Sequence, residues 1–227
     1  MIKVFALDPR RPDLSEEQFH AHWRGPHAEL ALRIRSQRRY VQNHRLPVEV
    51  PGLAPCIYDG MAEVWFDDFA AADGLLTDPD YTEYSFLDEP NFIDMTRIRF
   101  FSTGERVVLE GPPIAREADL VKVLLLLSRL PGLSPGAFDE RWLPHGASAV
   151  AALPGLLRHV QCPTSPESSA KGEPAFDGVS ELWWPDVDTF RRDWAAAGSA
   201  VLAGMAAFAV VPEVTGFLAE EYRVIWP

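Results

Sequence analysis

Cysteine is scarce in this chain, which has only Cys56 and Cys162 among its 227 residues. Two cysteines are too few for a disulfide framework, which excludes the small cross-linked scaffolds typical of secreted proteins. Long apolar runs are absent too, because the longest, Leu120–Leu127, is interrupted by Lys122 and falls far short of the roughly 20 residues that span a bilayer. The first residues lack the basic start and apolar stretch of a signal peptide. We therefore expect a soluble, cytoplasmic protein.

Basic residues are in deficit, with 21 lysines and arginines against 33 aspartates and glutamates and a net charge of −12. A protein that binds nucleic-acid phosphates needs a basic face, and an anionic membrane surface makes the same demand. We therefore expect no nucleic acid and no membrane among the partners. Hydrophobic residues make up 47% of the chain, which is enough for a well-buried core in one or two domains.

Several motifs with known chemistry are missing from the sequence. It has no G-x-G-x-x-G, P-loop, G-x-S-x-G, H-E-x-x-H or C-x-x-C. These motifs cradle nucleotide phosphates, present a nucleophilic serine, or supply zinc ligands and redox thiols. A nucleotide cofactor is not indicated, and we expect the protein to work without a cofactor.

The segment FHAHWRGPHAEL, residues 19–30, holds three of the six histidines and suggests a metal site. Zinc ligands on a helix must share one face, yet His20 and His22 are two residues apart and point to different sides. Between His22 and His27 the pair Gly25-Pro26 disturbs the helical phase. No cysteine or suitably spaced carboxylate completes a ligand set within the segment. We therefore expect no bound metal here.

The chain contains the same unit twice. Residues 2–23 (IKVFALDPRRPDLSEEQFHAHW) match residues 121–142, RYVQN at 39–43 matches RHVQC at 158–162, and YDGMAEVWFDD at 58–68 matches FDGVSELWWPD at 176–186. After a one-residue deletion, Pro26-His27 meets Pro144-His145. Rare residues in the same order at a nearly fixed spacing indicate duplication. We predict two domains, 1–110 and 120–227, joined by the Gly- and Pro-containing linker 109–119.

Each copy shows the pattern of strand, helix, two strands, helical region and strand. In the first copy the strands are expected at 2–8, from 39 onward, at 60–66 and at 97–108, and helical segments are expected from 15 and within 68–92. Ser15 followed by Gln18 predicts a capping box. The order βαββαβ is that of the ferredoxin-like fold, which is α+β with helices on one sheet face. We predict two such domains packed sheet to sheet, because each sheet would otherwise expose an apolar face.

The segments FHAHWRGPHAEL, RRYVQNH and YDGMAEVWFDD resemble the EthD family of dimeric α/β-barrel proteins. The family pattern F-H-x-x-W-x-x-x-H-x-x-L falls on Phe19, His20, Trp23, His27 and Leu30. Family members are usually single domains that pair, so the resemblance implies a dimer written into one chain. Such a chain would be a monomeric pseudo-dimer or would form a homodimer.

The resemblance also implies a range of reactions. Relatives in natural-product pathways are similar to dehydratases and cyclases of aromatic polyketides, and the wider class includes cofactor-free monooxygenases and lactone isomerases. The second copy departs from the family pattern, with Asp139 at the place of the first histidine, His159 for Tyr40 and Pro163 for His44. These departures suggest unequal sites in the two copies.

His27 and its counterpart His145 are the leading candidates for proton transfer. A histidine on an apolar helix stripe is often a hydrogen-bonded core residue. Histidine can nevertheless take or give a proton near pH 7 with little shift in its pKa. Both copies retain this histidine directly after a proline. The strand that begins at residue 39 brings Tyr40 and His44 to one face, where either could hold an oxyanion or could simply end the strand in solvent.

Strand 60–66 offers a second candidate set. Alternation places Asp59, Glu63 and Trp65 on one face, and the second copy repeats them as Asp177, Glu181 and Trp183. A mid-strand carboxylate is costly unless paired, so Glu63 is either a structural ion pair or a proton-transfer group whose pKa is raised by burial. We expect Asp59 to orient a histidine and Glu63 to serve as a reserve acid.

Together with these residues, the resemblance implies an enzyme without a cofactor that acts on a hydrophobic, aromatic or polyketide-like small molecule. Acid/base dehydration, cyclisation or isomerisation is expected, with His27, Tyr40, His44, Asp59 and Glu63 as catalytic residues. The substrate is expected to contact His20, Trp23, Trp65, His145 and Trp183. A cofactor-free monooxygenase and a non-catalytic binding protein are the alternatives.

Overall fold

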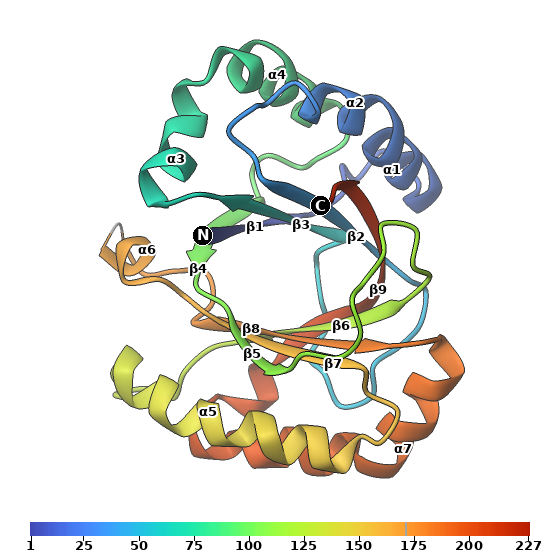
Figure 1. The fold of residues 1–227 in the computed structure, drawn as a ribbon, viewed down its shortest axis with the longest axis vertical. Coiled ribbons are helices and arrows are strands. Elements are labelled where there is room, and N and C mark those ends of the chain that lie inside the picture. The colour runs from blue at the N-terminus through green and yellow to red at the C-terminus, as the bar shows by residue number, and fades with distance from the viewer. Residues whose placement is uncertain (171) are drawn as a thin grey trace. The chain divides into compact units, whose positions relative to one another are not determined.

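The computed structural model describes residues 1–170 and 172–227 and divides into two compact units (Figure 1). Unit 1 consists of Met1–His44, Ile57–Thr103 and Glu221–Pro227, and unit 2 of Arg45–Cys56 and Gly104–Glu220. The predicted division at 1–110 and 120–227 therefore differs from the compact units in three short segments. The bounds of the sequence repeat reflect the duplication, whereas the bounds of a compact unit depend on which segments form hydrogen bonds and pack together. The segment 45–56, for example, lies in unit 2 because Leu46 donates its backbone N–H to Leu218, 2.8 Å away.

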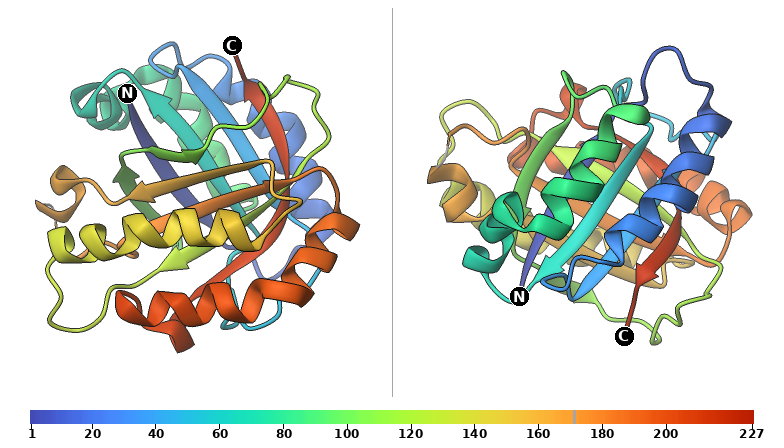
Figure 2. Two further views of the ribbon diagram at one scale, coloured as in Figure 1. Left: turned by 60° about the horizontal axis from the view of Figure 1, so that its bottom comes forward. Right: turned by 90° about the horizontal axis from the view of Figure 1, so that it is seen from above.

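Unit 1 has an antiparallel sheet in the order β4-β1-β3-β2, which the end of β9 extends beside β2. Its strands are β1 (Ile2–Asp8), β2 (Arg39–Arg45), β3 (Gly60–Phe66) and β4 (Arg99–Thr103). One face carries short helical segments, which are α1 (Glu16–His22), η1 (Trp23–His27), α2 (Ala28–Ala31), α3 (Phe69–Gly74), η2 (Leu75–Thr77), η3 (Tyr81–Ser85), α4 (Phe86–Asp88) and η4 (Glu89–Asn91) (Figures 1 and 2).

Unit 2 repeats this order as β9-β6-β8-β7, with β5 added beside β7. Its strands are β5 (Arg106–Leu109), β6 (Val121–Leu127), β7 (Arg158–Pro163), β8 (Gly178–Trp184) and the first part of β9 (Thr215–Ile225). Its helical segments are α5 (Pro135–Ala152), α6 (Pro166–Ala170), α7 (Val187–Gly204), η5 (Met205–Ala207) and η6 (Val211–Glu213). The two long helices α5 and α7 lie side by side over one sheet face (Figure 2). The α+β class and the ferredoxin-like strand order are confirmed.

The first helix shows why the copies differ by one residue. Ser15 and Gln18 form the predicted capping box, and the chain then passes from α1 into the π-helical turn η1, WRGPH. In unit 2 the equivalent WLPH lies within the continuous helix α5. A π-turn holds one extra residue, and such insertions in helices occur frequently at functional sites. The one-residue deletion in the repeat is therefore a local change of helix type.

A glycine at the start of β3 fixes the tryptophan of that helix against the sheet. A Cβ atom on Gly60 would lie 2.3 Å from Cζ3 of Trp23, and one on Gly178 would lie 2.5 Å from Cζ3 of Trp142. Any larger residue would displace the indole in either unit. Both units thus share the same packing of helix on sheet.

The sheet face away from the helices carries buried ion pairs. In unit 1 Lys3 Nζ lies 2.9 Å from Glu63 Oε2, and in unit 2 Lys122 Nζ lies 3.3 Å from Glu181 Oε1. All four side chains are at most 2% exposed. Buried charges are tolerated when they are paired and hydrogen-bonded, so these glutamates match the structural interpretation of the mid-strand carboxylate.

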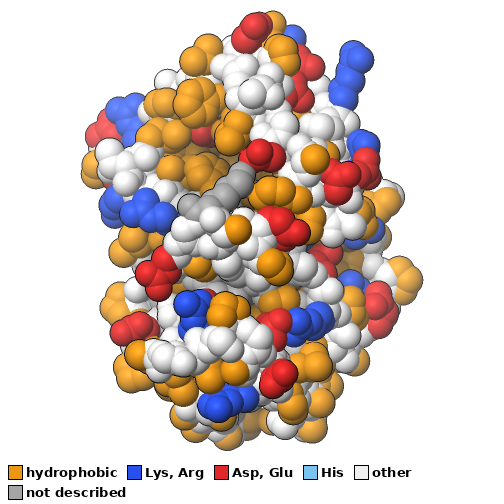
Figure 3. Space-filling view, turned by 90° about the vertical axis from the view of Figure 1, so that its left-hand side faces the viewer, with side chains coloured by type: hydrophobic (Ala, Val, Ile, Leu, Met, Phe, Trp, Pro, Cys, Tyr) orange, Lys and Arg blue, Asp and Glu red, His pale blue; other side chains and the backbone are white. Residues whose placement is uncertain are grey.

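No helix within the described residues is long and apolar enough to cross a membrane. On the face of the molecule drawn in Figure 3, basic side chains are scattered among acidic and hydrophobic ones instead of forming one basic surface. This distribution agrees with the net charge of −12 and gives no support for phosphate-backbone binding on that face.

Candidate active site

A cavity of about 70 Å³ lies within unit 1, between the helical segments and the sheet. Its walls are mostly apolar, and a few polar side chains reach it from different elements: Asp8, His27, Gln37, Tyr40, Tyr81, Ser85 and Glu89. An apolar cavity with a few convergent polar groups is the usual form of a small-molecule site. It has about half the volume of an engineered cavity of ~150 Å³ that holds benzene. It is therefore large enough for the reacting end of a ligand and too small for a whole aromatic molecule.

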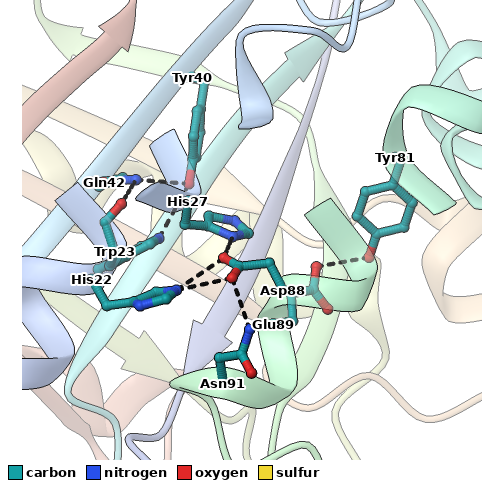
Figure 4. Close-up of polar contacts among 9 residues, drawn as sticks. All are labelled: His22, Trp23, His27, Tyr40, Gln42, Tyr81, Asp88, Glu89 and Asn91. Carbon is teal, nitrogen blue, oxygen red and sulfur yellow. Dashed lines mark hydrogen bonds and ion pairs between the residues drawn. The ribbon is translucent and has the colours of Figure 1, made fainter. Parts of the chain in front are cut away.

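Asp88 gathers two of the three clustered histidines (Figure 4). His27 Nδ1 donates to Asp88 Oδ2 at 3.0 Å, and His22 Nε2 donates to both carboxylate oxygens at 3.0 and 3.1 Å. Asn91 Nδ2 donates to Oδ1 at 3.0 Å. Burial disfavours the charged form of Asp88, but the hydrogen bonds from His27, Asn91 and His22 outweigh it and hold the pKa of Asp88 below its usual range. Asp88 is therefore a carboxylate that orients His27.

The bond to Asp88 decides the chemistry of His27. Because Nδ1 carries the proton that Asp88 accepts, Nε2 of the neutral ring holds a lone pair. No residue in the described chain makes a hydrogen bond to this Nε2, and His27 lines the cavity. A histidine with a carboxylate behind it and a free lone pair ahead of it is equipped to act as a general base.

Tyr40 presents a hydrogen-bond donor to the same cavity. Its hydroxyl oxygen accepts from Trp23 Nε1 at 3.1 Å and from Gln42 Nε2 at 3.1 Å. With both lone pairs used, the hydroxyl can only donate its proton, and none of the described residues supplies an acceptor. Burial raises the pKa of Tyr40 well above its ordinary value, so the hydroxyl stays protonated. It is suited to hold an oxygen atom on which negative charge develops.

His44 and His20 are linked to Tyr40 indirectly, through the side chain of Gln42. His44 Nε2 donates to Gln42 Oε1 at 3.1 Å, and Nδ1 of His44 lies 2.9 Å from Nδ1 of His20. Burial lowers the pKa of His44 well below its ordinary value, and the charges of Arg24 and His20 lower it further. His44 is therefore neutral and fixes the side-chain amide of Gln42, which in turn fixes Tyr40. Neither His44 nor His20 lines the cavity.

The remaining predicted residues of unit 1 lie elsewhere. Both carboxylate oxygens of Asp59 accept hydrogen bonds from Arg10, from its backbone N–H at 2.8 Å and its Nε at 3.3 Å. Asp59 therefore braces a loop and is not placed to orient a histidine. Glu63 binds Lys3 and Asn43 on the sheet face away from the cavity, and Lys3 also stacks over Trp65 at 4.4 Å. The structure separates these three residues from His27 and Tyr40, because alternate residues of β3 face opposite sides.

In unit 2 the predicted contacts His145 and Trp183 do not form a similar set. His145 Nε2 donates to the backbone oxygen of Val201 at 2.9 Å, so its proton is on the nitrogen opposite to that in His27. A groove of about 420 Å³ between α5 and α7 includes His145 and is lined mainly by small side chains. Trp183 packs under Lys122 at 4.7 Å on the other sheet face.

Four titratable residues of the site were not predicted from the sequence, namely Asp8, Tyr81, Asp88 and Glu89. Three of them lie in the segment 79–92, which was expected only to be helical or irregular. Their signal was present as an acidic pair, Asp88-Glu89, that unit 2 lacks. The informative pattern is therefore an asymmetry between the copies, whereas the predicted site residues rest mainly on what both copies share.

Glu105, Cys162 and Glu181 form the one group of three potential metal ligands within the described part of the chain, and it lies in unit 2. Glu181 already accepts from Cys162 Sγ at 3.1 Å and pairs with Lys122. An ammonium group thus supplies the positive charge at this glutamate.

The EthD domain model matches the chain twice, over residues 11–96 and 130–210. A solved structure described as an anthrone oxidase-like protein is 14% identical, with a TM-score of 0.67 over 98% of this chain and 93% of that chain. A protein from Fusobacterium nucleatum with proposed monooxygenase activity is 9% identical, with a TM-score of 0.56 over 98% and 91%.

A chlorite dismutase from Candidatus Nitrospira defluvii is 11% identical, with a TM-score of 0.53 over 98% of this chain and 91% of that chain. At these identities the solved structures show a common fold and nothing finer. No curated protein matches the chain.

Proposed function

The chain belongs to the EthD family, and on this premise we propose that unit 1 is an enzyme that moves a proton at a carbon next to a carbonyl group. The substrate is a small hydrophobic molecule, and the protein's own side chains carry the proton without a cofactor. One observation carries the proposal: His27 Nδ1 donates to Asp88 Oδ2 at 3.0 Å, which leaves Nε2 of His27 with a lone pair at an apolar cavity.

The proposed step uses two groups on the cavity wall. His27 Nε2 removes the proton from the carbon, and Asp88 stabilises the imidazolium that forms. The carbonyl oxygen becomes an enolate oxygen and accepts the hydroxyl proton of Tyr40 as a hydrogen bond. The apolar walls exclude water, which strengthens both interactions. Dehydration, cyclisation and isomerisation all begin with such an enolate.

An oxygenation is the second candidate, favoured by the likeness in fold to the anthrone oxidase-like protein. An electron-rich carbanion formed by His27 could react directly with O₂. The two candidates differ in one measurable quantity, because only the oxygenation consumes O₂ in step with product. Binding of a ligand with no turnover would instead identify a carrier protein.

The test is deuterium exchange into aryl ketones, with β-tetralone and phenylacetone as probes. Wild-type protein in deuterated water should label the carbon beside the carbonyl, and His27→Ala should lose at least about 100-fold in rate, the usual contribution of a general base. His145→Ala is the matched control and should label both ketones at the wild-type rate. Circular dichroism would confirm that each variant is folded.

Equal exchange by wild type and a folded His27→Ala would overturn the assignment. So would exchange no faster than in buffer for every ketone tested, since the proposed base would then have no detectable action.

A further inference from the structure

Two further acidic residues, Glu89 and Asp8, line the cavity that His27 also lines. Asp88 and Glu89 are neighbours in the chain, yet Figure 4 shows Asp88 turned toward the two histidines and Glu89 turned toward Tyr81. Tyr81 donates its hydroxyl to Glu89 Oε1 at 2.9 Å. Asp8, at the end of β1, lines the same cavity. The proposed proton acceptor and these carboxyl groups therefore share one small space.

Glu89 is buried and only half satisfied. Its side chain is in a residue only 6% exposed, and Oε2 has no hydrogen-bond partner within the described residues. Ser85, one helical turn earlier, also lines the cavity and leaves its Oγ without a partner. Buried polar atoms are rarely left unpaired, so each one calls for an occupant that completes its bonding. Two such atoms at one wall indicate a ligand oxygen at this position.

Asp8 and Glu89 are poorly placed to be charged together. The groups that face them are each other, the hydroxyls of Tyr81 and Tyr40, His27 and the ionised Asp88, and the cavity has no lysine or arginine among its described lining residues. Burial raises the pKa of Glu89 to about 7, and the charge of Asp88 adds to the rise against the opposing bond from Tyr81. Burial and the charge of Glu89 raise the pKa of Asp8 well above its usual range. At least one proton is therefore retained by the pair near neutral pH.

We infer that Glu89, paired with Asp8 and oriented by Tyr81, is the general acid that protonates a leaving hydroxyl group of the substrate. The inference rests on the proposed function and narrows it to one reaction, the elimination of water. It also names the substrate class, a carbonyl compound with a hydroxyl group on the second carbon from the carbonyl.

The step balances without any further reagent. His27 Nε2 takes the proton from the carbon beside the carbonyl, and the electrons of that C–H bond form the new C=C bond. The C–O bond to the hydroxyl breaks, and its oxygen takes the proton of Glu89 to leave as water. The product is an unsaturated ketone. The imidazolium of His27 and the carboxylate of Glu89 then return to their starting forms by exchanging one proton with solvent.

Unit 2 lacks all three acidic residues, Asp88, Glu89 and Asp8, which supports the view that they act together. The bridges Arg10–Ile93 and Arg129–Ala209 align the two units at this point. On that alignment Asp88 corresponds to Gly204, and Glu89 to Met205. The strand pairs of Asp8 and of Leu127 with a glycine of the next strand align Asp8 with Leu127. The carboxylate that orients the base, Asp88, and the two acidic residues Glu89 and Asp8 are all present in unit 1, and all three are absent from unit 2.

The experiment separates the acid from the base. The probe is the aldol adduct of benzaldehyde and acetone, whose dehydration gives the absorbing product benzylideneacetone. Wild type should form this product, and Glu89→Gln should lose at least about 100-fold in the elimination rate while still exchanging deuterium into β-tetralone within about threefold of wild type. Glu167→Gln, an exposed glutamate in unit 2, is the matched control and should leave both rates unchanged.

A spectroscopic measurement distinguishes a proton donor from a structural glutamate. The infrared carbonyl band of protonated Glu89 should disappear from wild type as the pH rises through about 7. This band should be missing from Glu89→Gln, in which any remaining carboxylic acid band belongs to Asp8.

Three results would overturn the inference: wild type that exchanges deuterium but does not eliminate water, Glu89→Gln that eliminates at the wild-type rate, or no such band. If wild type itself showed no deuterium exchange that depends on His27, the proposed function would be refuted instead.

Discussion

The two units of this chain share one frame and differ in what they place at the helix–sheet cavity. Both keep the tryptophan packed on a strand glycine and the histidine after a proline. Unit 1 adds carboxyl groups around its histidine, whereas unit 2 has Leu127, Gly204 and Met205 at the corresponding positions. The duplicated fold is therefore maintained by the shared residues, and the chemistry that we propose depends on residues that only one copy has.

The two equivalent histidines illustrate the difference most sharply. His27 Nδ1 donates a hydrogen bond to Asp88, and the lone pair on Nε2 is left for the cavity. His145 gives its Nε2 proton to the backbone oxygen of Val201, and its Nδ1 is buried without a partner within the described chain. The same residue type at the equivalent position, in η1 of unit 1 and in α5 of unit 2, is thus a candidate base in one unit and a packing residue in the other.

Replacing Glu89 by the residue of unit 2 should produce the larger change in stability. A glutamate in the unfolded chain has a pKa near its ordinary value of 4.5, and burial raises the pKa of folded Glu89 to about 7. Between these values the unfolded chain binds fewer protons than the folded one, so the stability of wild type falls as pH rises and then levels off. The penalty is about 3 kcal/mol, from the shift in pKa at about 1.4 kcal/mol per unit.

Glu89→Met should remove the contribution of Glu89 to this fall. Its free energy of unfolding relative to wild type should rise by about 3 kcal/mol from about pH 5 to about pH 8, as measured by urea titration. The lost bond from Tyr81 costs about 1 kcal/mol at either pH and does not affect the difference. A constant difference across this range would show that Glu89 is not a buried titrating group.

Replacing His159 by the residue of unit 1 should produce a smaller change. Tyr40 accepts from Trp23 in unit 1, but the equivalent Trp142 Nε1 has no hydrogen-bond partner in the described part of unit 2. His159→Tyr should return a hydroxyl to this place and raise the free energy of unfolding by about 1 kcal/mol. Double substitution with Trp142→Phe should cancel the gain, and a gain that persists would assign it to something other than this hydrogen bond.

The sequence predicted much of the fold because duplication repeats its packing residues. The strand order and the N-cap serine that opens the first helix, Ser15 in one copy and Ser134 in the other, follow from patterns that recur in both copies. The same reasoning gave weight to Glu63, Asp59 and Trp65, which recur because they serve the frame. The residues around His27 could not be found in this way, since unit 2 does not retain them.

Physical reasons also hid the site from sequence analysis. Glu89 and Asp8 are 81 positions apart in the sequence, and only the folded unit brings both carboxyl groups to one cavity. The π-turn that carries His27 breaks the regular helical period, so its phase could not be read from spacing. His22, which the spacing placed on a different side of the helix from His20, forms a hydrogen bond with Asp88 of α4.

The central claim is that the histidine of unit 1 alone is arranged as a base, and long-range ¹H–¹⁵N spectra of the two imidazoles test it most directly. His27 should carry its proton on Nδ1 and His145 on Nε2, and addition of β-tetralone should move the resonances of His27 only. The same tautomer in both rings, or a response confined to His145, would contradict the account.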